Sequence, residues 1–474
     1  MRQFLLYCII TLYIIFPNSL EAATIIYPQS EISTIDSDVT FFIGNGNPDS
    51  GLKINSEQVK IHRSGGFFYP VKLQSGENIF KIEDNENSQI YKIYRPEKSI
   101  QATNKESNKI YKEPEIYIVN KNNVPLRSTP INYGINRLQH FDNGVELKVI
   151  GEYENYYEVQ LARDDYAWIN KDYVKKAEEN TYQPAKIFAF AYDEFQQKTI
   201  YHIKLNKKVP YILSERITYN WNDNQTKLLP KFNGLDLVVY NVEGYPENKY
   251  EYFINNSNNR LKGYKSYYNS DDELIIEIIK APIVDITNPL NGINITIDPG
   301  HGGREYGTTG CHGNKEKNIN LAIAFKLKDY LQNAGANVYM TRADDSDLSL
   351  QDRVLYSQNS NSDIFISIHN NAIPDSEANN NHIGSSVYYY SIRSKRLAAA
   401  ILKRLTEELG MADDGLKQRS FAVLRNTESL CVLIEIGYLI KPEDNEKLLD
   451  SAFQDQAAKA IMHGLEDYLS GIQK

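Results

Sequence analysis

The sequence is poor in cysteine and has no block of cationic residues. Its 474 residues include only three cysteines, Cys8, Cys311 and Cys431, which excludes a disulfide scaffold and a cysteine-rich zinc finger. Asp and Glu number 61 against 52 Lys and Arg, so the net charge is −9 with neutral histidines. Because nucleic-acid binding draws its affinity from clustered cations, this acidic balance disfavours a nucleic-acid partner.

Long apolar runs are also missing, apart from one at the N-terminus. That run, Phe4 to Phe16, covers 13 residues, whereas a membrane-spanning helix needs about 20. Arg2 precedes it and Ala22 and Ala23 follow it, so residues 1–23 are typical of a secretory signal peptide. An uncleaved membrane anchor is the alternative. We expect a secreted protein of the periplasm or the extracellular cell wall, with no stable membrane span once the signal is removed.

Residues 24–282 alternate short apolar runs with turn residues, a pattern typical of antiparallel strands. It predicts three small all-β modules: a β-sandwich over 24–97, a module of short strands over 114–176, and a β-rich candidate targeting module over 186–282. Residues 98–113 are polar and aperiodic, which predicts a linker. Tyrosine is abundant, with 35 residues. Exposed rings would suit sugar or peptide stacking, although packing within half-buried sheets is the simpler interpretation.

The pattern changes at residue 293, where strand-like and helical segments begin to alternate. INITI, DIFISIH and CVLIEIGYL are continuous apolar runs. Asn318–Ala334 and Leu397–Leu409 repeat apolar residues at helical spacing, and each is followed by a glycine. One further helix is expected to start over Leu350–Tyr356, and another to run from about Gln454 to Leu469. Strands alternating with helices predict an α/β domain over 293–474 whose mostly parallel sheet is covered on both faces. The chain is therefore predicted to be multidomain.

Four polar side chains of this α/β domain indicate its chemistry. They are His301, Glu316, His369 and Glu435. Most of them stand at or just after strand ends, and ligands gather at the carboxyl ends of strands in such sheets. Two histidines and one glutamate form a known catalytic zinc set that leaves a fourth position for water. A carboxylate outside that set can accept and return a proton, and Glu435 suits this role.

The order of motifs around these residues resembles the zinc N-acetylmuramoyl-L-alanine amidases, in the third of the common amidase domain classes. The motifs in chain order are DPGHGG, Lys315-Glu316-Lys317, AGANVYMTR, Leu350-Gln351-Asp352-Arg353, SIHNNA, GSSVYYY and LIEIGYL. Each is weak alone, but their shared order over residues 293–474 is a specific signal. The resemblance implies that His301, Glu316 and His369 bind Zn2+ and that Glu435 is catalytic. Leu430-Cys431 and Ile440-Lys441 replace residues usual in the family without removing a catalytic group.

The resemblance implies a secreted peptidoglycan hydrolase. It would cleave the amide between N-acetylmuramic acid and the L-Ala of the stem peptide by zinc-activated water. The alternatives are a zinc peptidase that cuts within the stem peptide and a non-catalytic wall-binding protein. Residues 114–176 resemble the bacterial Src-homology-like barrels found beside cell-wall hydrolases, which implies a targeting module. A spacer barrel without a ligand is the alternative. We expect the β modules to raise the local substrate concentration and to be unnecessary for cleavage itself.

Each proposed site residue also has a purely structural interpretation. These are a turn-stabilising role for His301, a helix-dipole role for Glu316, a core role for His369, and a buried ion pair of Glu435 with Arg342 or Arg425. Arg342 and Arg353 are expected to brace the domain rather than contact substrate.

The surroundings of the site give three further expectations. Cys311 and Cys431 are both expected near the site, where an oxidising compartment would allow a disulfide. His312 and His382 are interpreted as exposed and non-ligating. The loop Ala372–Ile383 is short and contains Pro374 and three consecutive asparagines, so it disfavours a helix that would cover the metal. We therefore expect an open site.

Overall fold

The computed structural model describes residues 22–85, 87–97, 109–178, 181–221, 228–256, 261–378 and 383–471. Most of the predicted signal peptide, residues 98–108 of the predicted linker, and His382 lie outside these residues. The chain forms two compact units. Unit 1 contains the described residues up to Glu97 and two segments from much later in the chain, Gly310–Gly313 and 374–378, while unit 2 contains the rest. No helix in the described ranges is both long and apolar enough to cross a membrane.

Unit 1 is built from two sheets around one core. The first sheet has the order β1 (Thr24–Tyr27), β3 (Val39–Asn45), β6 (Gly66–Lys72). The second has the order β2 (Ile32–Thr34), β8 (Asn87–Arg95), β7 (Gly76–Asp84), β4 (Lys53–Ile54), β5 (Glu57–Gln58). Phe42 lies in the core, with its ring centroid 5.3 Å from Phe80 and 5.5 Å from Tyr91. The alternating pattern thus buries aromatic rings between sheets.

The segment 374–378 is held in unit 1 by its aspartate. Asp375 lies in the 3-10 turn η3 (Asp375–Glu377). Its carboxylate accepts hydrogen bonds from the Tyr27 hydroxyl at 2.9 Å and from Thr40 Oγ1 at 2.5 Å. The loop Ala372–Ile383 therefore contains one 3-10 turn among its described residues, in place of the longer helix that its sequence disfavours.

The segment Gly310–Gly313 is also held in unit 1 by polar contacts. Asn45 donates from Nδ2 to the carbonyl oxygen of Cys311 at 3.1 Å. His312 is exposed, as predicted, and its Nε2 lies 2.9 Å from the carbonyl oxygen of Ser64. A Cβ at Gly66 would overlap the Cys311 sulfur. Glycine at position 66 thus allows this close approach.

In unit 2, residues 109–176 form one seven-stranded sheet. Its order is β11 (Arg137–Phe141), β10 (Val124–Arg127), β14 (Tyr166–Asn170), β13 (Tyr156–Gln160), β12 (Glu146–Tyr153), β9 (Lys109–Val119), β15 (Val174–Lys176). β9 begins within the segment predicted as a linker, 98–113. Lys109 and Ile110 pair with β12 through the backbone while both remain exposed. This start of the strand buries no apolar face, so the sequence gives no periodic signal for it.

The next strands of unit 2 form two antiparallel sheets. One has the order β16 (Ile187–Glu194), β17 (Lys198–Leu205), β22 (Glu273–Lys280), β21 (Leu261–Tyr268). The other has the order β18 (Tyr211–Trp221), β19 (Leu228–Tyr240), β20 (Lys249–Asn255). Their buried residues and those of the seven-stranded sheet form a single cluster, in which Phe141 and Tyr211 have ring centroids 5.9 Å apart. The second and third predicted modules therefore share one core.

The C-terminal domain is built on a six-stranded sheet. The order is β24 (Asn337–Met340), β23 (Asn294–Pro299), β25 (Ile364–Asn371), β28 (Leu430–Tyr438), β26 (Ser385–Tyr389), β27 (Asp413–Gln418). The first four strands are parallel, as predicted. β26 runs antiparallel to β28, and β27 is parallel to β26, so the sheet is mixed. A parallel connection normally requires a crossover segment, usually an α-helix. No α-helix is described between β25 and β26, which agrees with the reversed direction of β26.

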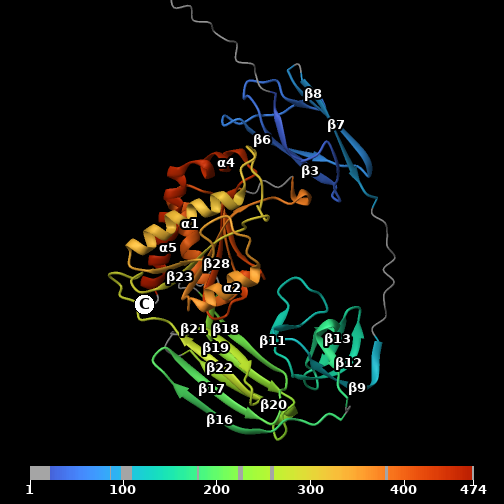
Figure 1. Ribbon diagram of the computed structural model, residues 1–474, viewed down its shortest axis with the longest axis vertical. Coiled ribbons are helices and arrows are strands. Elements are labelled where there is room, and N and C mark those ends of the chain that lie inside the picture. Colours follow the sequence, from blue (N-terminus) through green and yellow to red (C-terminus); the bar gives the residue numbers. More distant parts are fainter. Residues whose placement is uncertain are drawn as a thin grey trace, which may run out of the picture. The chain divides into compact units, whose positions relative to one another are not determined.

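Five helices accompany this sheet: α1 (Glu316–Asn333), α2 (Leu350–Asn359), α3 (Lys395–Leu409), α4 (Pro442–Leu449) and α5 (Ser451–Gly471). Figure 1 shows α1 and α5 together beside the strands. Apolar residues of α1, α3 and α5 share one core with alternate residues of the parallel strands. The other alternate residues, including Phe365 and Leu433, pack against η5 (Ala422–Arg425). Both sheet faces are thus covered, as the continuous apolar runs predict.

Candidate metal centre

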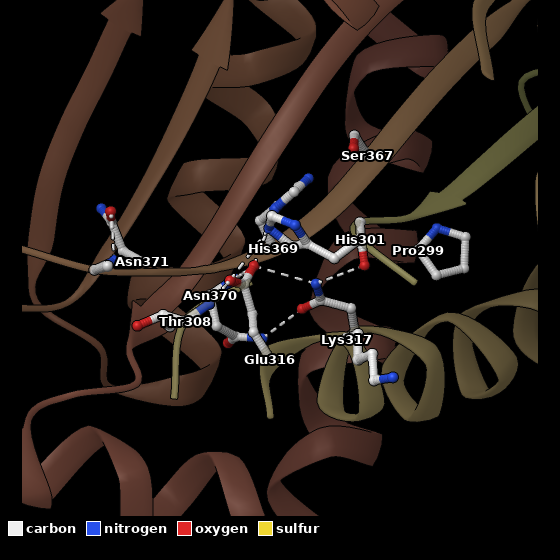
Figure 2. A network of polar contacts seen from close by, with 12 residues as sticks. Pro299, His301, Thr308, Glu316, Lys317, Ser367, His369, Asn370 and Asn371 are labelled. Atoms are coloured by element: carbon white, nitrogen blue, oxygen red, sulfur yellow. Dashed lines mark hydrogen bonds and ion pairs between the residues drawn. The ribbon is translucent and has the colours of Figure 1, made fainter. Parts of the chain in front are cut away.

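His301, Glu316 and His369 come from three separate elements and meet at one point. His301 follows β23, Glu316 is the first residue of α1, and His369 lies near the end of β25. Their candidate ligand atoms all lie within 4.8 Å of one another. His301 Nε2 is 3.3 Å and His369 Nδ1 is 3.0 Å from the Glu316 carboxylate. Figure 2 shows the two rings beside that carboxylate. The three groups are close enough to share one metal ion.

The Glu316 carboxylate is oriented by three further donors. Its residue is 4% exposed. Oε2 accepts a hydrogen bond from the Thr308 backbone N–H at 2.9 Å. Oε1 accepts from the Asn370 backbone N–H at 3.1 Å and from Asn320 Nδ2 at 3.2 Å. The residue types in the sequence do not predict these three donors. Only Asn320 carries a local signal, because it lies one helical turn after Glu316, on the same face of α1.

The charge of Glu316 is set by its histidine neighbours. Burial alone would raise the pKa of this carboxyl, but hydrogen bonds from His301 and His369 and their positive charge hold it below its ordinary range. The carboxylate is therefore anionic at neutral pH. Two imidazoles and one carboxylate are a donor set that Zn2+ takes in catalytic sites, so these residues fit that ion.

The DPGHGG turn places His301 through unusual backbone geometry. His301 has a backbone φ of +61° and Gly302 one of +144°. Residues other than glycine seldom adopt a positive φ. A Cβ on Gly300 would overlap the His369 ring. Glycine at position 300 therefore lets the two histidines approach, with ring centroids 4.9 Å apart.

A buried ionic network lies under this turn. Asp298 is 1% exposed and accepts hydrogen bonds from Thr341 Oγ1 at 2.6 Å, Ser367 Oγ at 2.7 Å and Arg353 Nη1 at 2.7 Å. Arg353 also donates from Nη2 to the His301 carbonyl oxygen at 2.9 Å. The network ties the two histidine-bearing strands to α2, and it confirms the prediction that Arg353 braces the domain.

Arg342 holds the same turn from another side. Its Nε donates to the Pro299 carbonyl oxygen at 2.9 Å, and its Nη2 donates to the Gly300 carbonyl oxygen at 3.0 Å and the Lys317 carbonyl oxygen at 2.8 Å. These bonds connect the end of β23 with the first turn of α1. The predicted bracing role is confirmed, although Arg342 acts through backbone carbonyls rather than through ion pairs.

Glu435 lies in β28, beside the strand β25 that carries the candidate ligand His369. It is paired with His369 in the register between β25 and β28. Its Oε2 is buried and has no hydrogen-bond partner among the described residues. Burial and then the negative charge of Glu316 raise the pKa of Glu435 well above its ordinary value, while Lys417 acts in the opposite direction. A buried carboxyl oxygen without a partner is costly for stability.

The structural interpretation of Glu435 as half of an arginine ion pair is wrong. Arg342 is bonded to the turn carbonyls described above. Arg425 donates from Nη1 to the carbonyl oxygen of Ser420 at 2.5 Å. Both arginines therefore have other partners, and neither neutralises Glu435.

The cysteines depart from the expectation. Cys311 and Cys431 are both buried, and no disulfide joins them in the described residues. Cys431 stands near the start of β28, where it packs with Phe365 and Leu433, four residues before Glu435. Strand spacing of about 3.3 Å per residue separates those two positions by roughly 13 Å. Cys431 is therefore a core residue, and the predicted proximity to the site is wrong for it.

The ends of β23 and β25 bring two histidines next to the glutamate that begins α1, which defines an α/β domain able to hold a metal ion. The model of the N-acetylmuramoyl-L-alanine amidase family matches residues 295–467. The probable cell wall amidase LytH of Staphylococcus epidermidis is 37% identical over 186 residues, which are 39% of this chain and 61% of LytH. YqiI of Bacillus subtilis is 34% identical over 189 residues, 40% of this chain and 90% of YqiI. The N-acetylmuramoyl-L-alanine amidase LytC of Bacillus subtilis is 36% identical over 183 residues, 39% of this chain and 37% of LytC.

The chain belongs to the N-acetylmuramoyl-L-alanine amidase family, as the motif order implies. It spans about three fifths of the length of the Staphylococcus epidermidis LytH that it matches. The family match covers the C-terminal domain and leaves the β-rich residues before 295 outside it.

Proposed function

We propose that this protein is a secreted zinc hydrolase of peptidoglycan. It cleaves the amide between N-acetylmuramic acid and the L-Ala of the stem peptide. The observation that carries this proposal is the convergence of His301, Glu316 and His369 within a domain of the amidase family. One relative named as a probable cell wall amidase and another named as an N-acetylmuramoyl-L-alanine amidase support a substrate in the cell envelope. A place in the periplasm or the extracellular cell wall is consistent with such a substrate.

The roles proposed for the site residues follow from their positions. His301, Glu316 and His369 would hold Zn2+, which when bound lowers the pKa of a water to about 7 and polarises a carbonyl. Glu435 takes a proton from the attacking water and returns it to the departing amine nitrogen. Its unpaired buried Oε2 and its register beside His369 support this role.

The surrounding residues keep these groups in place before substrate binds. Thr308, Asn320 and Asn370 fix the Glu316 carboxylate, and such contacts to ligand side chains commonly change metal affinity by about 10–100-fold. Asp298 and Arg353 fix the turn that carries His301. The catalytic groups therefore need little rearrangement on substrate binding, which lowers the barrier to reaction.

The β-rich residues would keep the enzyme on its polymeric substrate. The resemblance of residues 114–176 to Src-homology-like barrels supports this role. Binding to peptidoglycan through a second site would raise the effective substrate concentration at the metal centre.

The bond that is cleaved distinguishes this function from its alternatives. The protein lacking residues 1–23 is incubated with purified sacculi, and newly formed amino termini are identified. Free N-terminal L-Ala supports the proposal, whereas new amino termini elsewhere in the stem peptide indicate a peptidase. Binding without release indicates a wall-binding protein. Chelator treatment should abolish release, and added Zn2+ should restore it.

A further inference from the structure

Two arginines face each other across a strand pair in unit 2. Arg127 of β10 and Arg137 of β11 are direct partners in the antiparallel register. Arg127 is 5% exposed and Arg137 is half-buried. Like charges directly opposite each other on neighbouring strands are destabilising, and burial strengthens their repulsion. Such a pair therefore requires a source of negative charge.

A third arginine and a histidine share this location. His140 Nε2 lies 3.2 Å from Arg137 Nη1. Burial, and then the positive charges of Arg425 and Arg127, lower the pKa of Arg137 to about 10. Burial and the same arginines, with Arg137, lower the pKa of His140 to about 4. His140 is thus neutral at pH 7, and Arg425 from η5 adds a third guanidinium from the amidase domain.

No carboxylate neutralises these arginines in the described part of the chain. Arg127 donates from Nη1 to the amide oxygen of Asn136 at 2.8 Å, and Arg425 donates to the Ser420 carbonyl oxygen. Glu215 is the carboxylate that acts on neighbouring Tyr390. It already accepts hydrogen bonds from Arg393 at 2.9 Å and from Ser391 at 2.5 Å. The three arginines therefore have neutral partners only.

We propose that Arg127, Arg137 and Arg425 form a binding site for a phosphate-class oxyanion. Guanidinium groups match the oxygens of phosphate in paired hydrogen bonds, and the neutral ring of His140 supplies one further polar contact. Three positive charges favour a ligand with more than the single charge of a carboxylate. Inorganic phosphate and a polymer of phosphodiesters share this chemistry.

The site is distinct from the metal centre. Arg425 precedes the start of β28, whereas Glu435 lies in the second half of that strand. The parallel strands carry the candidate metal ligands at their carboxyl ends, so the arginines lie toward the opposite edge of the sheet. An anion bound there would join the seven-stranded sheet to the amidase domain without touching the reacting groups.

The test measures thermal unfolding of the protein lacking residues 1–23 in a chloride buffer of fixed ionic strength. Inorganic phosphate should raise the melting temperature saturably. Arg137→Gln should lose this rise without lowering the melting temperature in chloride, because it removes repulsion. An equal rise with chloride, or an unchanged phosphate response in the variant, would overturn the proposal. Arg163→Gln, an exposed arginine of the same sheet region, is the charge-matched control and should respond like wild type.

Two additions make the result decisive. Arg425→Gln tests the same site from the amidase domain, so a folding defect of Arg137→Gln leaves the question answerable. A glycerol phosphodiester polymer is compared with inorganic phosphate at equal phosphate concentration. Tighter binding of the polymer identifies a polymeric ligand, equal binding identifies free phosphate, and binding of neither rejects the site. Hydrolysis of soluble muropeptides should be unchanged in both variants, which separates failure of this proposal from failure of the proposed enzymatic function.

Discussion

Arg393 and Glu215 form a buried ion pair between the amidase domain and strand β18, with Nε and Oε1 2.9 Å apart and side chains 3% and 12% exposed. Arg393 also donates to the carbonyl oxygens of Lys262 and Thr427. Lys262 in β21 pairs in turn with Asp363 at 2.8 Å. Because these charges are buried against each other, the strands between residues 187 and 280 contribute to the stability of the amidase domain.

Breaking the Arg393–Glu215 pair should therefore lower the free energy of unfolding strongly. Glu215→Gln leaves the buried Arg393 guanidinium without its counter-charge, and we expect a loss of about 3–5 kcal/mol in the free energy of unfolding. Urea denaturation of the protein lacking residues 1–23 measures it. Asp236→Asn breaks the neighbouring exposed pair with Arg216 and should cost about 0–1 kcal/mol. Similar small losses in both variants would show that the buried pair stabilises the protein no more than the exposed pair does.

The same contacts predict how the chain tolerates truncation. The sequence predicts that residues 293–474 suffice for cleavage. Removing β18 and β21 deprives both Arg393 and Asp363 of their partners, so we expect residues 293–474 alone to melt lower and to be less soluble than residues 181–474. Melting temperature and hydrolysis of soluble muropeptides are measured on both. Equal melting temperatures and equal hydrolysis by the two fragments would mean that residues 293–474 fold stably without the preceding strands.

Substitutions at the metal centre should separate metal binding from proton transfer. We expect Glu435→Gln to keep one zinc per chain and to lose release from sacculi, because only the proton carrier is removed. His301→Ala and His369→Ala should lose zinc as well as activity. Elemental analysis and the release assay on the same samples provide the measurement. Near-normal release by Glu435→Gln would remove this residue from the mechanism.

The network under the DPGHGG turn should affect both stability and metal affinity. Asp298→Asn leaves the buried Arg353 without its anionic partner, and we expect a loss of about 3–5 kcal/mol in unfolding free energy. Zinc affinity should fall about 10–100-fold as His301 loses its support. Zinc competition with a chelator measures the second effect. Asp347→Asn is the control, since its pair with Arg304 is exposed, and it should change neither quantity appreciably.

The sequence predicts those elements whose local pattern agrees with their packing. α1 and α3 bury one apolar stripe, and α3 ends at Gly410, whose φ of +60° suits a helix end. α4 was not predicted, because PEDNEKLL is short and mostly polar. β27 was not predicted either, since DDGLKQ is a polar strand at the sheet edge. These two elements owe their conformation to neighbours rather than to a periodic pattern.

The candidate site was predictable only in part, for a similar reason. The motif order predicts His301, Glu316 and His369 as metal ligands, and their candidate ligand atoms lie close together in the structure. Thr308 and Asn370 contribute backbone N–H groups to Glu316, and any residue type can supply those. The reversed strand β26 likewise depends on how the chain crosses the sheet. Features made by the backbone or by chain direction leave no signature in residue types.

The two late segments of unit 1 determine when that unit can be completed during synthesis. Its first residues precede 98, yet Asp375, which binds Tyr27 and Thr40, is made about 280 residues later. At roughly 5–20 residues per second, the N-terminal strands wait for about a quarter of a minute to one minute before their last partner emerges. During that interval the early strands have an unfilled surface where the two late segments belong. Folding of the N-terminal unit is thereby coupled in time to translation of the first half of the amidase domain.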